Sequence, residues 1–286
     1  MQISTLFVSF GHGLVFSLIA FLFIVFAKII DDNRTTAFDD DYEIEEKGNS
    51  AVGFRRTGLY IAYAIAFAGT LSGKSTGFVK DIYALFIDGF LITFCLFVCR
   101  SINDRVMLSS LNNDEEIHKG NTAVGLAECG MYIATGFVLN GAFTGTSENM
   151  LSGIISALVF FVAGQVALLL CGLCYEIITP FNVRNEIKKG NAAAGTALAG
   201  ILIALGVILR ASIAGPTMGW AEDFLSFGLY TLYGIVLLLA FRKAIDKFLL
   251  PSTSIEIEVE RDQNVAALSL TQAGIIAIAI VISSVM

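Results

Sequence analysis

The chain has 286 residues, of which 56% are hydrophobic and only 15% are charged, and its mean hydropathy is +0.75. This balance is typical of an integral membrane protein and leaves no room for a soluble catalytic domain of ordinary size. The net charge of −7 does not change that conclusion. We expect the lipid bilayer to surround the chain, and we expect no nucleic acid partner.

Eight stretches are long enough and apolar enough to cross a bilayer, which takes about 20 residues. The first stretch is not expected to be a secretory signal, because no Lys or Arg precedes it and its apolar part is too long. The predicted fold class is therefore an all-α integral membrane protein with eight transmembrane helices and short acidic cytoplasmic loops. The expected spans are residues 6–30, 51–71, 82–99, 123–143, 150–175, 193–213, 224–241 and 265–285.

The distribution of basic residues predicts the orientation of these spans. Of the 18 Lys and Arg residues, 15 lie in or beside the loops after spans one, three, five and seven. The exceptions are Lys74, Lys80 and Arg210. Since cytoplasmic loops of membrane proteins are enriched in Lys and Arg, these four loops are predicted to be cytoplasmic. Both termini are then on the outer, periplasmic side of a bacterial inner membrane.

A short motif repeats at the cytoplasmic start of every even-numbered span. It reads KGNSAVGF from Lys47, KGNTAVGL from Lys119 and KGNAAAGT from Lys189, with a decayed copy, RDQNVAAL, from Arg261. Each repeat contains two spans, so all four repeats point the same way and are predicted to be parallel repeats related by rotation about the membrane normal. They group into two membrane domains, residues 1–146 and 147–286, with two repeats each.

The repeated Asn residues and the residues that follow them indicate helix starts and helix packing. Asn49, Asn121, Asn191 and Asn264 are predicted N-caps; the alternative is a ring of Asn side chains around a pore mouth. Small residues recur 2, 9, 13 and 20 positions after each Asn, within about 40 degrees of one another on a helix. Such a seam lets helices approach closely in lipid. Its members are Ala51, Gly58, Ala62 and Gly69; Ala123, Gly130, Ala134 and Gly141; Ala193, Gly200, Ala204 and Ala211; and Ala266, Ala273, Ala277 and Ser284.

These tandem helix pairs, each with its KGN-x-A motif, resemble the YjfL-type bacterial inner-membrane family, domain of unknown function 350. Members of that family typically carry two such pairs, so the chain looks like a doubled version over nearly its whole length. The resemblance implies a bacterial inner-membrane protein without an established activity, with a tie to membrane-stress or polyamine-related gene neighbourhoods. It provides no catalytic residues.

Charged residues inside membrane spans are costly and often functional. Arg55 and Arg56 lie six and seven positions after Asn49, and Glu128 lies seven positions after Asn121. Arg56 and Glu128 are therefore at the same depth in neighbouring repeats, about 10 Å along their helices, and a buried pair between them is predicted. The alternative for Arg56 is that it reaches back to the cytoplasmic lipid headgroups.

A second polar layer is predicted in the outer half, made of His12, Asp88, Asn140 and Arg210. Asp88 and Arg210 are candidates for an ion pair, and a carboxylate with a cationic partner is typical of proton or cation pathways. His12 is interpreted as an interfacial residue in preference to a proton shuttle. Gln165 is expected to form a hydrogen bond with a neighbouring helix.

The sequence contains no motif typical of catalysis or cofactor binding. The five Cys residues are interpreted as packing residues, because they lack the setting of a redox motif or the spacing of metal ligands. No phosphate loop or nucleophile elbow is present. We therefore expect no enzymatic activity, no catalytic residues, no cofactor and no metal.

The loops carry acidic runs, and two of them alternate acidic and apolar residues. YEIE at residues 42–45 and IEIEVE at residues 255–260 have the period of two that is typical of strands. If the four repeats close into a ring, these two loops are neighbours, and a short cytoplasmic strand pairing between them is predicted. An acidic rim would also concentrate cations, including polyamines, or bind a basic protein partner.

Two functional classes remain open from the sequence. The first is a channel or transporter for protons or small cations that uses Arg55, Arg56, Glu128, Asp88, Arg210, His12 and Asn140 as intramembrane polar stations. The second is a membrane scaffold or stress-related protein that binds a cytoplasmic partner through its acidic loops. Homo-oligomerisation is compatible with the small-residue seams, although the repeats could use all of these seams internally.

Overall fold

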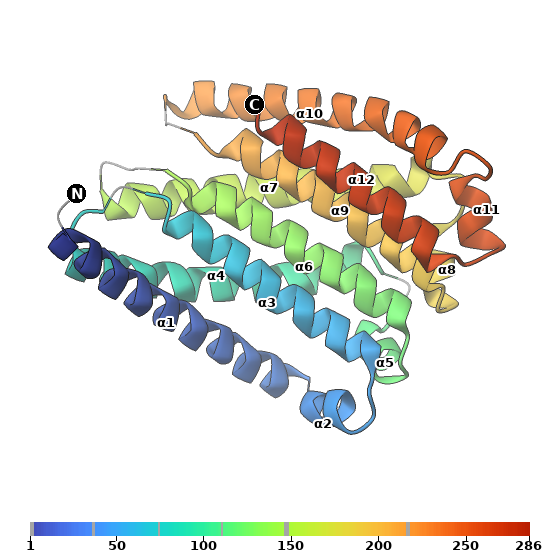
Figure 1. Ribbon diagram of the computed structural model, residues 1–286, viewed down its shortest axis with the longest axis horizontal. Coiled ribbons are helices and arrows are strands. Elements are labelled where there is room, and N and C mark those ends of the chain that lie inside the picture. Colours follow the sequence, from blue (N-terminus) through green and yellow to red (C-terminus); the bar gives the residue numbers. More distant parts are fainter. Residues whose placement is uncertain (1–2, 36–37, 74, 110, 146–148, 216–217) are drawn as a thin grey trace.

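The computed structural model describes residues 3–35, 38–73, 75–109, 111–145, 149–215 and 218–286, and every regular element in these residues is a helix (Figure 1). The predicted domain boundary between residues 146 and 147 lies outside the described residues. The long helices are α1 (Ile3–Arg34), α3 (Ser50–Thr70), α4 (Phe78–Val106), α6 (Thr122–Phe143), α7 (Met150–Ile178), α9 (Ala192–Ile213), α10 (Trp220–Leu249) and α12 (Val265–Ser283). The short helices are α2 (Asp40–Glu45), α5 (Asn113–His118), α8 (Val183–Lys188) and α11 (Ile255–Glu260).

Within the described residues, seven helices are long and apolar enough to cross a membrane: Val8–Arg34 of α1, and α4, α6, α7, α9, α10 and α12. The helix α3 is long enough to cross a membrane but is not among the helices that are sufficiently apolar. It contains Arg55 and Arg56, which lower its hydropathy, although both side chains are buried inside the protein.

The long helices form a row of four with a second layer against it. In the row, α3, α6, α9 and α12 lie side by side in chain order and run in the same direction (Figure 1). In the second layer, α4 packs against α3 and α6, α7 against α6 and α9, and α10 against α9 and α12, while α1 packs against α3 and α4. The row is open, because α3 and α12 stand at its two ends (Figure 1).

The four short helices gather at one end of the bundle, which we call the cap end, and both termini lie toward the other end (Figure 1). Each short helix is followed by the motif residues that begin the next helix of the row. The motif glycines Gly48, Gly120 and Gly190 have positive φ angles of 62°, 84° and 85°. Glycine adopts this conformation without strain, whereas the decayed fourth copy places Gln263 there, with φ 46°.

The predicted strand pairing between residues 42–45 and 255–260 is wrong. Both segments are helices, α2 and α11, and they lie at opposite ends of the open row (Figure 1). The side chains of Asp39 and Ser254 accept hydrogen bonds from first-turn amides and so cap these helices. Acidic residues in the first turn add favourable interactions with the helix dipole, and a period of two over so few residues does not distinguish a strand from a helix.

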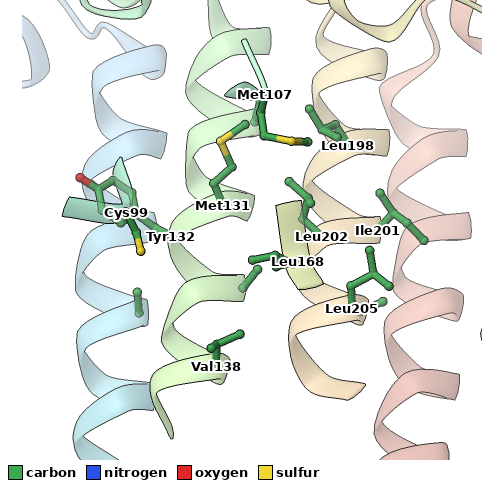
Figure 2. Packing of buried hydrophobic residues seen from close by; sticks show 14 of the residues in the cluster. Cys99, Met107, Met131, Tyr132, Val138, Leu168, Leu198, Ile201, Leu202 and Leu205 are labelled. Atoms are coloured by element: carbon green, nitrogen blue, oxygen red, sulfur yellow. The ribbon is translucent and has the colours of Figure 1, made fainter. Parts of the chain in front are cut away.

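The small-residue seam forms the contacts within the row. A Cβ atom placed on Gly125 would lie 2.4 Å from the carbonyl oxygen of Ala51, and one on Gly195 would lie 2.5 Å from that of Ala123. The backbones therefore touch, as small residues allow in lipid. Larger apolar side chains, among them Met131, Leu168 and Leu202, fill the space around this seam (Figure 2).

Candidate functional site

The four motif Asn residues are all N-caps, and the first three also connect neighbouring repeats. The side-chain oxygen of Asn121 accepts a hydrogen bond from the amide of Val124 at 3.3 Å. Its side-chain nitrogen donates to Glu116 at 3.1 Å and to the carbonyl of Ile187, in the next repeat, at 3.1 Å. Because the helices form an open row, the equivalent residues Asn49, Asn191 and Asn264 do not converge on one axis.

Near the cap end, Arg55 and Arg56 project from the start of α3 into a group of carboxylates. Arg55 is fully buried and donates to Asp40 at 2.7 Å and to Asp114 at 2.9 Å. Arg56 donates to Asp40 at 2.9 Å and to Asp41 at 2.5 Å, and it also pairs with Asp32. These bonds tie α3 to the end of α1 and to two short helices.

Arg100 extends this group onto α4. Its guanidinium donates to Asp31 at 2.5 Å and to Asp114 at 2.6 Å, and its Nε atom lies 3.8 Å from Asp104, one turn further along the helix. Both Arg100 and Asp31 are buried. The buried ends of α1, α3 and α4 therefore share one ionic network.

The predicted pair between Arg56 and Glu128 is wrong. Arg56 lies five residues after Ala51, which turns its side chain about 140 degrees from the seam that contacts α6. Glu128 likewise lies five residues after Ala123, so its side chain is turned about 140 degrees from the seam of α6 that contacts α9. Equal depth on neighbouring helices therefore does not make the two residues face each other, and Glu128 forms no hydrogen bond or ion pair with the described residues.

Glu128 is the most unusual side chain of the group. It is 2% exposed, and both carboxylate oxygens are buried without a hydrogen-bond partner among the described residues, as is the hydroxyl of Tyr132. Glu128 lies within electrostatic range of Asp104, Arg100 and Arg55. Glu128 and Tyr132 line a cavity of about 10 Å³, which is close to the smallest volume that holds one water molecule.

Asp104 connects this cavity with the surface at the cap end. It lines the small cavity beside Glu128, and it also lines a surface cavity of about 500 Å³ that includes Arg34, Asn113 and Asp114. Asn113 donates a hydrogen bond of 3.0 Å to Asp104. Asp104 is therefore the residue that the linings of the two cavities share.

We call this group the buried ionic cluster. It has four cations and seven carboxylates, so its formal charge is −3 if every group is ionised. Asp41 and Asp114 are partly exposed, whereas Asp31, Asp40 and Glu128 are buried. Because buried charges without partners are costly, the excess of carboxylates favours the uptake of protons or cations. Burial raises the pKa of the Asp40 carboxyl, although Arg55 and Arg56 act against the increase. Its members are Lys28, Arg55, Arg56, Arg100, Asp31, Asp32, Asp40, Asp41, Asp104, Asp114 and Glu128.

A short chain of polar side chains continues from the cavity toward the middle of the bundle. Thr135 and Asn103 both line the cavity. Thr135 donates to Gln165 at 3.3 Å, and Gln165 donates to Asn103 at 3.0 Å. The expected interhelical hydrogen bond of Gln165 is therefore present, and it joins α6, α7 and α4.

In the second polar layer, at the end opposite the caps, Asn140 and Arg210 are hydrogen-bonded, but the predicted pair of Asp88 and Arg210 does not form. Arg210 donates to Asn140 at 2.7 Å, and Asn140 donates to the carbonyl of Ile65 at 2.6 Å. Asp88 does not pair with Arg210, because it lies on α4, which packs between α3 and α6, whereas Arg210 lies on α9. His12 stacks on Phe78, with 4.0 Å between ring centroids.

The sequence reasoning missed Arg100, Asp104 and Tyr132 as members of the site. The predicted third span ends at residue 99, which places Arg100 in or beside the following loop. The helix continues to Val106, and its last turns are buried against α6. The spacing of Arg100 and Asp104, four residues apart, was the available signal for a continued helix face.

Comparison with known proteins gives one curated relative, named "UPF0719 transmembrane protein", from Aquifex aeolicus (strain VF5). It is 26% identical over 271 residues, which cover 94% of this chain and 98% of the relative. No solved structure shows a significant match to the chain. Together with the seven apolar helices, this similarity identifies a multi-pass membrane protein.

A family model, described as Domain of Unknown Function (DUF350), matches residues 5–143 and again residues 149–286. Each match contains two helices of the row with their preceding outer and short helices. The chain is thus a member of the DUF350 family with two consecutive copies of the family domain.

Proposed function

We propose that the protein crosses the bacterial inner membrane eight times, as four parallel two-helix repeats, and moves protons or small cations through its N-terminal half. The α3 helix is included as a span because it lies in the row beside α6, and its arginines are buried inside the protein instead of facing lipid. Most Lys and Arg residues lie near the cap end, which supports a cytoplasmic cap end and outer termini.

The observation that carries the proposal is the unpartnered carboxylate of Glu128. An ionised carboxylate without hydrogen bonds in a buried site is strongly disfavoured, so the group is stable only when it binds a proton or a cation. Intramembrane carboxylates that face small polar cavities are the usual stations of proton and ion pathways. In this proposal Glu128 alternates between loaded and unloaded states.

Entry from the cytoplasm uses Asp104. The cation or proton collects in the surface cavity beside Asp114, passes Asp104 and reaches Glu128 in the water-sized cavity. The network of Arg55 and Arg100 keeps the neighbouring aspartates in place. An excess of carboxylates over cations in this network favours cations over anions.

Exit toward the outer side requires a second conformation. Beyond the Thr135 and Gln165 hydrogen bonds, the interior at Val138 and Leu139 is apolar and fully buried. Asn140, Arg210 and Asp88 lie past this apolar layer. The proposal is therefore a gated path, open to the cap end in the present conformation.

The test is flux in sealed proteoliposomes, with protons, potassium and spermidine followed separately. The wild type should give saturable flux of at least one of them, and Glu128→Gln should abolish it, because the amide cannot exchange the proton or hold a cation. Asp88→Asn reports whether the outer carboxylate also takes part. Glu260→Gln is the matched control, since Glu260 is an exposed acid outside the cluster and its variant should conduct normally.

A second candidate function is a non-transporting scaffold that binds a basic cytoplasmic partner. The observation in its favour is that all three buried arginines are paired, which is what a purely structural network requires. Absence of flux above empty liposomes for all three cations, with protein that is folded and inserted, would exclude the transport proposal. Pull-downs with α2 and α5 as the expected contact surface would then test the scaffold.

A further inference from the structure

The contacts between neighbouring helices of the row repeat in one register. Counted from each cap Asn, positions 2, 9 and 13 of one helix contact positions 4, 8 and 15 of the next. Ala51 and Ala62 of α3 touch Gly125 and Gly136 of α6, and a Cβ on either glycine would lie 2.4 to 2.7 Å from their backbone atoms. On the next pair of helices, Ala123 and Ala134 touch Gly195 and Gly206 in the same way. One interface is therefore used repeatedly along the row.

At the α12 end of the row, the first side of this interface is uncovered. The seam residues Ala266, Ala273, Ala277 and Ser284 of α12 are all exposed, whereas their equivalents on α3 and α6 are buried. These positions are small although none of the described helices covers them.

At the α3 end, the second side of the interface is uncovered. Gly53 occupies position 4 after its cap Asn, as Gly125 and Gly195 do, yet a Cβ atom on Gly53 would have no other atom within 4 Å. Thr57 and Ala64, at positions 8 and 15, are exposed. The two ends of the row are therefore complementary halves of the same interface.

At the cap end, hydrogen bonds connect each repeat to the following one except at the α12 end of the row. Asn49, Asn121 and Asn191 each donate to a backbone carbonyl of the following repeat, at Ile117, Ile187 and Val259, over 3.0, 3.1 and 2.8 Å. Asn264 donates to Glu258 within its own repeat, and its side-chain nitrogen has no second acceptor among the described residues. At the other end of the row, Ile44 of α2 occupies the place that Ile117 occupies in α5, so its carbonyl is the equivalent acceptor.

In the second layer, α1 lacks a second neighbour among the described helices of the row. The helices α4, α7 and α10 each lie between two helices of the row, but α1 has only α3 on its side of the row. A further row helix beside α3 would give α1 the second wall that the other outer helices have.

We propose that the chain associates head to tail with a second copy of itself, with α12 of one copy packed against α3 of the next. The repeated register places Ala266 opposite Gly53, Ala273 opposite Thr57 and Ala277 opposite Ala64, and Asn264 then donates to the Ile44 carbonyl of the next copy. Such a heterologous contact continues the row without a break and can add copies at both ends, closing into a ring if the rotation allows. This inference does not depend on the transport proposal.

The test is disulfide crosslinking in membranes that contain two differently tagged populations. One population carries Ala273→Cys and the other carries Thr57→Cys; mild oxidation should join the two tags in a species of twice the chain mass. The matched control replaces Thr57→Cys with Ala68→Cys on the same exposed face. Ala68 lies 11 residues further along α3, about 16 Å away, so this pair should crosslink no more than the wild type with its five native cysteines.

An additional substitution tests the interface at a different position from the two introduced cysteines. Adding Ala277→Trp to the matched pair should remove most of the crosslinked product, whereas adding Val166→Trp, on the exposed face of α7, should leave it unchanged. Equal crosslinking of the matched and mismatched pairs would overturn the proposal and indicate that lipid covers both ends. Crosslinking of Ala273→Cys with itself, and not with Thr57→Cys, would overturn it in favour of a symmetric α12 contact.

Discussion

In the N-terminal half, residues 5–143, the helix ends near the caps bury Arg55, Arg56, Arg100 and Glu128, whereas the C-terminal half buries no arginine among its described residues. At the position seven residues after the cap Asn, where α6 has Glu128, α9 has Leu198 and α12 has Thr271. The C-terminal half nevertheless forms the same row, the same caps and the same short helices.

The difference between the halves indicates which features the scaffold needs. Caps and glycine turns occur in both halves, and backbone contacts join α3 to α6 and α6 to α9, so these features are sufficient to build the repeat. The buried ionic cluster occurs in only one half, and buried charges are usually neutral or unfavourable for stability compared with apolar residues. We infer that the cluster serves the function and that the C-terminal half provides an internal control for testing it.

The largest effect is expected from removing one partner of the cluster. Arg100→Leu leaves the buried carboxylate of Asp31 without its cationic partner and should lower the free energy of unfolding by about 3–5 kcal/mol. In the C-terminal half, Arg242 lies over the ring of Tyr175, 5.1 Å from its centroid, and interacts electrostatically with Asp246, so Arg242→Leu should cost about 1 kcal/mol. Reversible unfolding in mixed micelles, followed by circular dichroism, measures both; equal losses would remove the distinction between the halves.

A smaller effect, equal in both halves, is expected from the seam. Gly125→Ala and Gly195→Ala each place a methyl group against a backbone that cannot move aside, and each should cost about 1–3 kcal/mol. The equivalent Gly53→Ala meets no atom within 4 Å and should stabilise the isolated monomer by up to about 1 kcal/mol. The same unfolding assay applies, and a loss for Gly53→Ala in the monomer would contradict the open end of the row.

The fourth motif copy should gain stability when its glycine is restored. Gln263 has a φ of 46°, a left-handed conformation that costs a residue with a side chain roughly 1 kcal/mol or more. We therefore expect Gln263→Gly to stabilise the protein by about 1 kcal/mol, and Gly190→Gln, in the third copy, to destabilise it by a similar amount. Thermal melts of the purified variants measure the two shifts, which should have opposite signs.

The smallest expected effect is on how the melting temperature depends on pH through the acidic side chains that bind the cap Asn residues. Hydrogen bonds from Asn121 and then Lys119 lower the pKa of Glu116. Because the folded pKa lies below the unfolded value of about 4.3, the interaction stabilises the protein above that value and is lost as the pH falls through the folded pKa. Glu116→Gln should therefore reduce the loss of melting temperature between neutral pH and pH of about 3, whereas Glu256→Gln, at an exposed acid, should not.

Much of the architecture was predictable because it depends on local chemistry. The motif Asn residues cap helices through bonds to amides two or three residues away, and the following alanines and glycines define the contact face by helix geometry alone. The family resemblance and its duplication were also predicted, and both are confirmed. The second glycine stripe, at Gly125 and Gly136, was missed, although its spacing is as regular as that of the first.

The candidate site was only partly predictable. The sequence singled out Glu128, Arg55 and Arg56 as costly charges within spans, but it paired Arg56 with the wrong residue. Their partners, among them Asp40 and Asp114, come from loops and short helices that are distant in the sequence. The ring that would have made α2 and α11 neighbours was also an assumption that local patterns could not test.

The sequence by itself determined the helices, their caps, the repeat and its contact face, because these follow from interactions within a few residues and from the 100-degree helical turn. The tertiary structure alone decided that the repeats form an open row, that Glu128 faces a cavity with Asp104 and that three arginines share the surrounding aspartates. Those features depend on which faces of distant helices meet. Packing of the whole bundle sets that arrangement, and no local spacing encodes it.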